Sequence, residues 1–173
     1  NRRRRQLHLS LAAMIAGTTI WATHFIAMLG YSPADNIGYE PVLTGLSLLT
    51  AIAGCGLAVA LAGVPKMKLR AVVGGIIFGL TVAAMHYLGV FALQMPGRFE
   101  WRAEIVALSV VFGCFFGIIM VHRVMYPVTR YCWLGATVAM VLAVCTMHFT
   151  GMAAAKFVPD LAIGIPDRLI SKF

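Results

Sequence analysis

Residues 145–152 read CTMHFTGM, and two earlier segments repeat the pattern: WATHFIAM at residues 21–28 and AAMHYLGV at residues 83–90. Their histidines, His24, His86 and His148, are 62 residues apart both times. A constant spacing of this kind is typical of a repeated structural unit. Two long apolar segments fall within each 62-residue period, which predicts a repeated hairpin of two membrane-spanning helices. Because the unit has two spans, each copy returns to the membrane in the same direction.

The composition is that of a membrane protein. Of the 173 residues, 61% are hydrophobic and 12% are charged, whereas an average soluble domain has roughly 25% charged residues. A soluble domain of this size has too little interior to bury so much apolar surface. Intrinsic disorder is excluded as well, because disordered chains are poor in Leu, Ile, Val and Phe.

Five apolar segments are long enough to cross roughly 30 Å of hydrocarbon. They predict an all-α, polytopic transmembrane helix bundle, with short polar connections that make neighbouring helices antiparallel. We expect the chain, 1–173, to be a single transmembrane domain and a fragment of a larger protein, with residues 158–173 as a tail or linker. The expected spans are at about residues 7–29, 42–63, 71–93, 105–121 and 133–155.

Basic residues near the ends of the spans predict the orientation, because Lys and Arg there are retained in the cytoplasm. One side of the membrane receives nine of the 14 basic residues, including Arg2 to Arg5 and Lys66, Lys68 and Arg70. The opposite side receives the other five and all six acidic residues. We therefore expect Arg2 to Arg5 to be cytoplasmic. Topology and contact with anionic lipid headgroups then explain the net charge of +8, without nucleic-acid binding.

The three histidines are expected to lie at one depth, near the outer ends of the first, third and fifth spans, roughly 10 Å below the boundary at a rise of 1.5 Å per residue. The expected spans contain no Asp, Glu, Lys or Arg, so these histidines and His8 are the readily ionisable groups at membrane depth. Polar groups there are costly and usually functional. We expect the three side chains to converge in the bundle interior, within about 5 to 8 Å of one another, as a shared metal site requires.

Methionines accompany the histidines: Met85 and Met147 directly precede two of them, and Met28 and Met152 follow two of them by four residues, one helical turn away. Imidazole and thioether groups without a carboxylate form a soft, neutral ligand set that suits copper, especially Cu(I). Each methionine, and Cys145, can also act as core packing. The candidate metal ligands are His24, Met28, Met85, His86, Met147, His148 and Met152.

Other functions remain open from the residues alone. Two histidines at equal depth on different helices can ligate haem, which would make the chain a membrane electron-transfer protein. Catalysis is disfavoured because the spans contain no paired acid and base, no nucleophile arrangement and no phosphate-binding loop. Ion transport is disfavoured because the spans contain no carboxylate and no interior Pro. The pair Gly75 and Gly79 forms a GxxxG motif, which suits packing within the bundle or dimerisation.

The segments MHY at residues 85–87 and MHFTGM at residues 147–152, repeated with WATHF at residues 21–25, resemble the MHYT family of bacterial integral membrane sensor domains. The resemblance implies a seven-helix domain of the bacterial inner membrane, of which this chain holds helices two to six, with its metal site near the outer face. It also implies copper held by the Met and His residues of the motif. Thr23 replaces the motif's Met in the first copy, and Val90 replaces the downstream Met in the second.

The resemblance further implies a role in sensing oxygen, carbon monoxide, nitric oxide or a redox change. The family is joined in cis to cytoplasmic signalling domains, such as diguanylate cyclases, cyclic-di-GMP phosphodiesterases or histidine kinases. We therefore expect this domain to be a sensor module without enzymatic activity of its own.

Overall fold

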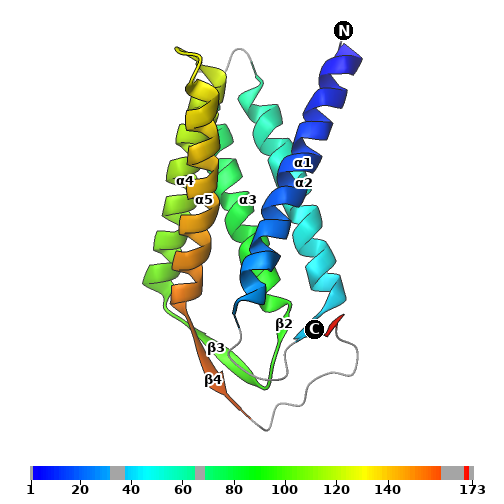
Figure 1. Ribbon diagram of the computed structural model, residues 1–173, viewed down its shortest axis with the longest axis vertical. Coiled ribbons are helices and arrows are strands. Elements are labelled where there is room, and N and C mark those ends of the chain that lie inside the picture. The colour runs from blue at the N-terminus through cyan, green and yellow to red at the C-terminus, as the bar shows by residue number, and fades with distance from the viewer. Residues whose placement is uncertain (1, 32–37, 65–68, 161–169, 172–173) are drawn as a thin grey trace.

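The computed structural model describes residues 2–31, 38–64, 69–160 and 170–171. Its five long helices lie side by side (Figure 1): α1 (Arg2–Leu29), α2 (Pro41–Ala62), α3 (Arg70–Phe91), α4 (Ala103–Met125) and α5 (Cys132–Ala154). Each is long and apolar enough to cross a membrane. Large apolar side chains such as Ile26, Val42 and Trp133 are exposed on the bundle surface, as lipid contact requires. The chain is therefore a multi-pass membrane domain.

Helix α3 is the central element of the bundle. Each helix packs against its neighbours in sequence, and α3 also contacts α1 and α5. It is accordingly the most buried of the five. This arrangement places α3 between the two other helices that carry the repeated motif (Figure 1).

The glycines of α3 permit a close approach to α4. A Cβ atom on Gly79 would lie 2.5 Å from the Cα of Cys114, and one on Gly117 would lie 2.5 Å from the carbonyl oxygen of Gly75. Helices in a membrane approach this closely where small residues line the contact. The GxxxG pair of Gly75 and Gly79 therefore serves packing within the chain.

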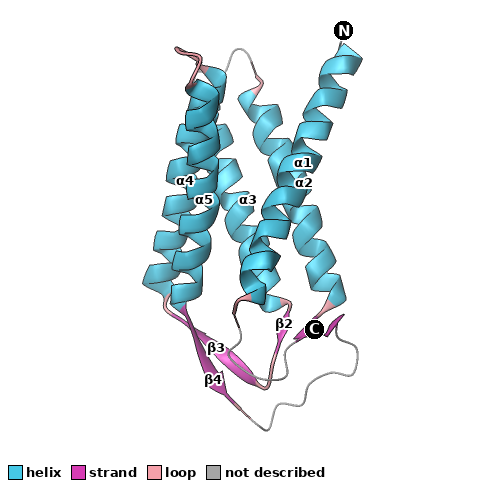
Figure 2. Ribbon diagram, viewed as in Figure 1, coloured by secondary structure: helices cyan, strands magenta, loops and turns pink. Residues whose placement is uncertain are grey.

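Short strands lie at one end of the bundle, called here the strand end (Figure 2). One sheet has the order β2 (Leu93–Gln94), β1 (Gly38–Tyr39), β5 (Ile170–Ser171), and the other pairs β3 (Gly97–Trp101) with β4 (Ala155–Pro159), all antiparallel. The expected all-helical bundle is confirmed for the spans, and the connections at this end add short strands that the sequence did not indicate. The strands pair the segments that leave α3 and α5 at the same end.

The helices of the structure overlap all five expected spans, and two of them are longer than their apolar segments. Helix α1 begins at Arg2 rather than at residue 7, and α4 covers Ala103–Met125 rather than 105–121. The length of an apolar segment indicates only the part of a helix that crosses hydrocarbon. The helix can continue beyond that part, because Arg and Lys are also good helix formers. The expected tail, 158–173, begins inside β4, and its residues 161–169 lie outside the described residues, as do Lys66 and Lys68.

Candidate metal centre

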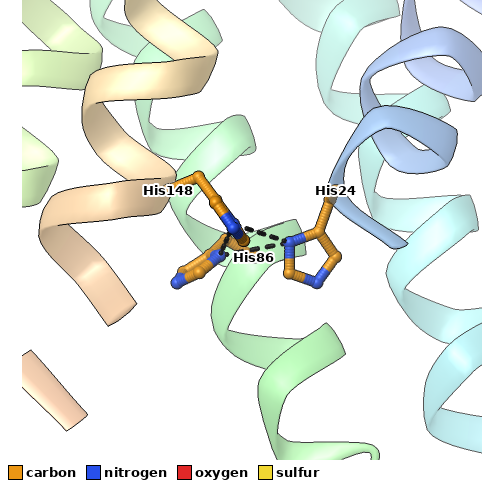
Figure 3. A group of neighbouring side chains, drawn as sticks. All are labelled: His24, His86 and His148. Atoms are coloured by element: carbon orange, nitrogen blue, oxygen red, sulfur yellow. Dashed lines mark hydrogen bonds between the residues drawn. The ribbon is translucent and has the colours of Figure 1, made fainter. Parts of the chain in front are cut away.

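Three helices bring their histidines to one point in the bundle interior (Figure 3). His24 comes from α1, His86 from α3 and His148 from α5, and all three are buried. The Nδ1 atom of His86 lies 3.2 Å from those of His24 and His148, which are 3.3 Å from each other. The ring centroids are 5.0 to 5.3 Å apart, which confirms the predicted convergence.

The three Nδ1 atoms form a nearly equilateral triangle of metal-site dimensions. A point equidistant from them lies about 1.9 Å from each, which is the side length divided by the square root of three. Imidazole nitrogens bind zinc at roughly 2.0 to 2.1 Å, so an ion just outside the plane of the triangle meets all three at an ordinary bond length. The group fits a single metal ion with three nitrogen ligands.

The protonation of the rings leads to the same interpretation. A hydrogen bond needs one N–H and one lone pair, and a neutral imidazole carries only one proton. Three Nδ1 atoms that face one another as lone pairs repel unless a cation lies between them. With a cation bound by the three Nδ1 atoms, the proton of each ring would sit on Nε2. The Nε2 atoms of His24 and His86 are buried without a hydrogen-bond partner within the described part of the chain.

Glycines three residues after two of the histidines make room for the rings. Nε2 of His86 lies 2.6 Å from where a Cβ on Gly151 would stand, and a Cβ on Gly89 would overlap Nε2 of His24. Each imidazole is thus seated against the backbone of the next motif helix. The sequence contained this signal, a Gly at the same offset in two of three copies, but its contact with a ring on another helix was not predicted.

The candidate methionines divide between two parts of the core. Met85 and Met147 are buried in the larger core cluster, together with apolar residues of α1 and α2. Cγ of Met147 lies 3.3 Å from where a Cβ on Gly113 would stand, so this side chain packs against α4. Met28 is buried in a second cluster at the strand end, and Met152 packs against it. The sequence had grouped all four around the histidines.

Residues beside the histidines have separate contacts. The hydroxyl of Tyr87 is hydrogen-bonded to Oγ of Ser109 on α4 at 2.7 Å, a partner that the sequence did not indicate. Phe149 is 66% exposed and faces outward from the bundle rather than packing against a neighbouring helix. Cys145 is not part of the group of close donor atoms, which consists of the three histidines in the described residues.

The spacing of the nitrogens disfavours haem. Two axial imidazoles bind iron from opposite faces of a porphyrin, so their ligating nitrogens are separated by two bonds of roughly 2 Å in line. The observed 3.2 to 3.3 Å is shorter, and the third histidine occupies the space that the porphyrin plane requires. The arrangement favours a bare ion.

The sequence matches the family described as MHYT, bacterial signalling protein N-terminal repeat, at residues 17–75, 79–137 and 142–170. The chain belongs to the MHYT family. Three matches in series agree with the three copies of the histidine motif, one on each of α1, α3 and α5. As an MHYT domain, the chain is the membrane sensor portion of a signalling protein. No solved structure matches it with significance.

Three curated relatives are each 34% identical to the chain. An uncharacterized signaling protein of Caulobacter vibrioides matches 94% of this chain and 20% of its own length. In Pseudomonas aeruginosa, the cyclic di-GMP phosphodiesterase NbdA matches 92% of the chain and 21% of its own length. The bifunctional diguanylate cyclase/cyclic di-GMP phosphodiesterase MucR of that organism matches 84% and 22%. The chain thus spans about a fifth of the length of these relatives.

Proposed function

We propose that this MHYT domain is a copper-binding membrane sensor module that controls a signalling domain in cis. The triangle of Nδ1 atoms from His24, His86 and His148 is the observation that carries the proposal, because it offers three nitrogen ligands to one ion. Met28, Met85, Met147 and Met152 are the candidate thioether ligands. Met28 and Met152 are placed one helical turn beyond their histidines, on the same face.

The donor set favours copper over other metals. Magnesium, calcium and manganese prefer oxygen ligands, and the close group contains only imidazole nitrogens. Imidazole and thioether ligands stabilise Cu(I). Cu(I) held by His24, His86 and His148 would supply a centre able to bind a diatomic ligand such as oxygen, carbon monoxide or nitric oxide.

The placement of the ligands on three helices supports a sensor. A ligand or redox change at the ion shifts the protein between conformations only if it binds them with different affinity. Because α1, α3 and α5 each provide one histidine, any change in the preferred nitrogen geometry acts directly on the packing of these helices. Two relatives are named as enzymes of cyclic di-GMP turnover, and we propose an output of this kind, on the cytoplasmic side, for the full protein.

The proposed location is the bacterial inner membrane, with Arg2 to Arg5 in the cytoplasm and the strand end facing out. The charge distribution described above supports this orientation. The metal centre then lies in the outer half of the bilayer, reached from the outer face.

Metal analysis of the detergent-purified domain tests the proposal. After exposure to Cu(I) and removal of loosely bound ions, we expect the wild type to retain about one more copper ion per chain than His86→Ala. His122→Ala is the matched control, because His122 lies in the last turn of α4, outside the group. Equal copper in the wild type and His86→Ala, or no copper in either, contradicts the proposal.

A further inference from the structure

A second core cluster, called here the strand-end cluster, lies directly beyond the histidines. Its buried members include Met28, Tyr39, Val90 and Met95, and Met152 packs against it. Met28 follows His24 by one turn of α1 and is fully buried. The cluster therefore extends from one turn beyond the metal centre to the strands, because Tyr39 belongs to β1.

The repeat explains why methionines meet in this cluster. The position four residues after each histidine holds Met28, Val90 and Met152 in the three copies. Since the histidines converge, positions one turn further along the same helical faces converge as well. Two of these positions provide thioethers, and Val90, which is fully buried, does not.

Met95 provides a third thioether from outside the repeat. It follows β2 and lies in the connection to β3, and it is buried in the same cluster as Met28 and Val90. The backbone around it is held from both sides. Its carbonyl accepts a hydrogen bond from the N–H of Gly97, and the carbonyl of Pro96 accepts one from the N–H of Asp160. The connection thus holds Met95 in the cluster that contains Val90, the residue that replaces the downstream methionine in the second copy.

The cluster also contains a polar group without a partner. Tyr39 is 7% exposed, and its hydroxyl has no hydrogen-bond partner in the described part of the chain. Burial raises the pKa of Tyr39 above its ordinary value, so the hydroxyl stays protonated. Buried polar groups are almost always paired, with protein, water or a bound ion. The orphaned hydroxyl therefore marks a polar position in a cluster that is otherwise apolar and rich in methionine.

We propose that Met28, Met95 and Met152 form a second soft-metal site, which receives a monovalent ion of the Cu(I) or Ag(I) class at the strand end and passes it to the three histidines. Thioethers select soft ions. No electron is transferred in this step, since the ion moves from sulfur to nitrogen ligands without a change of charge. The transfer of the ion to the three histidines rests on the function proposed above. Binding of the ion by the thioethers does not need the histidines.

Silver(I) is the probe, because it is soft and stable to oxidation. A His86→Ala chain whose four free cysteines are replaced by alanine separates the two sites, since thiols also bind Ag(I). In that background we expect retained Ag(I) with sulfur neighbours in X-ray absorption spectra. Met95→Leu, which nearly conserves volume, is expected to weaken Ag(I) binding by about tenfold or more. Met14→Leu is the control, because Met14 is half exposed on α1.

The outcomes distinguish the two proposals. If His86→Ala binds no Ag(I), or binds it without sulfur neighbours or without any effect of Met95→Leu, the thioether site is overturned and the histidine site is untouched. If the wild type binds Ag(I) through sulfur but never loads copper on nitrogen, the thioether site stands and the proposed function fails. If Met95→Leu does not fold, the cysteine-free His86→Ala chain with all methionines intact keeps the test valid, because its sulfur neighbours are then thioethers.

Discussion

Gly151 of α5 and His86 of α3 fit against each other without space for a side chain at residue 151. A Cβ there would lie 2.6 Å from Nε2 of His86, 3.1 Å from its Cδ2 and 3.3 Å from the hydroxyl oxygen of Tyr87. The orientation of this imidazole, and therefore the direction of its Nδ1, depends on a glycine of another helix. The relation links helix packing to the geometry of the metal centre.

Gly151→Ala is expected to displace the ring of His86 and to lower copper affinity by about 10- to 100-fold, the effect typical of losing the groups that orient a ligand. Competition with a chromophoric Cu(I) chelator measures this. Gly45→Ala is the matched control, because a Cβ at Gly45 meets no atom within 4 Å. Unchanged affinity in Gly151→Ala would show that the packing of this ring does not determine binding.

The α3–α4 contact gives a prediction about stability. Gly79→Val places a side chain against the backbone of Cys114 and Gly113, and such overpacking costs about 1 to 3 kcal/mol or more. We expect a clearly lower unfolding temperature in detergent. Gly56→Ala, whose added Cβ makes an ordinary 3.6 Å contact with Ala13, should leave it nearly unchanged. Equal stability of both variants would refute the tight packing.

The start of α2 depends on the side chain of Glu40. Its carboxylate accepts hydrogen bonds from the backbone N–H groups of Val42 at 3.0 Å and Leu43 at 2.6 Å. Loss of an N-cap costs about 0.5 to 2 kcal/mol, so Glu40→Ala should lower the unfolding temperature. Glu40→Gln keeps an acceptor and should lose less. If Glu40→Ala and Glu40→Gln both unfold at the wild-type temperature, the side chain of Glu40 does not stabilise the start of α2.

Membrane orientation can be tested with single cysteines in a chain whose four native cysteines are replaced. Arg98→Cys, in β3, should react with an impermeant maleimide added to intact cells, whereas Leu69→Cys, at the other end of the bundle, should react only after lysis. The expected difference follows from the retention of basic residues in the cytoplasm. The reverse labelling pattern would invert the orientation and place the metal centre in the inner half of the bilayer.

The spans and the convergence of the histidines could be predicted because both follow from simple periodicities. Apolar length identifies each span, and the 62-residue spacing places His24, His86 and His148 at one depth. The rotation of each helix about its own axis does not follow from such periodicities. How closely Met147 packs against Gly113 of α4 depends on how α5 turns against its neighbours, and no spacing in the sequence gives that.

The strands and Met95 could not be predicted for a different reason. Strands of two to five residues carry too little alternation to be recognised, and they form because the ends of α3 and α5 are adjacent. Met95 lies outside the repeat, so no spacing relates it to Met28. Only the folded connection between β2 and β3 brings both into one cluster.

X-ray absorption spectroscopy of the copper-loaded domain tests the central claim most directly. The account predicts one Cu(I) ion with imidazole nitrogens at roughly 1.9 to 2.1 Å, and loss of this imidazole signal in His86→Ala but not in His122→Ala. Copper without imidazole ligands in the wild type, or an identical spectrum in His86→Ala, would contradict it.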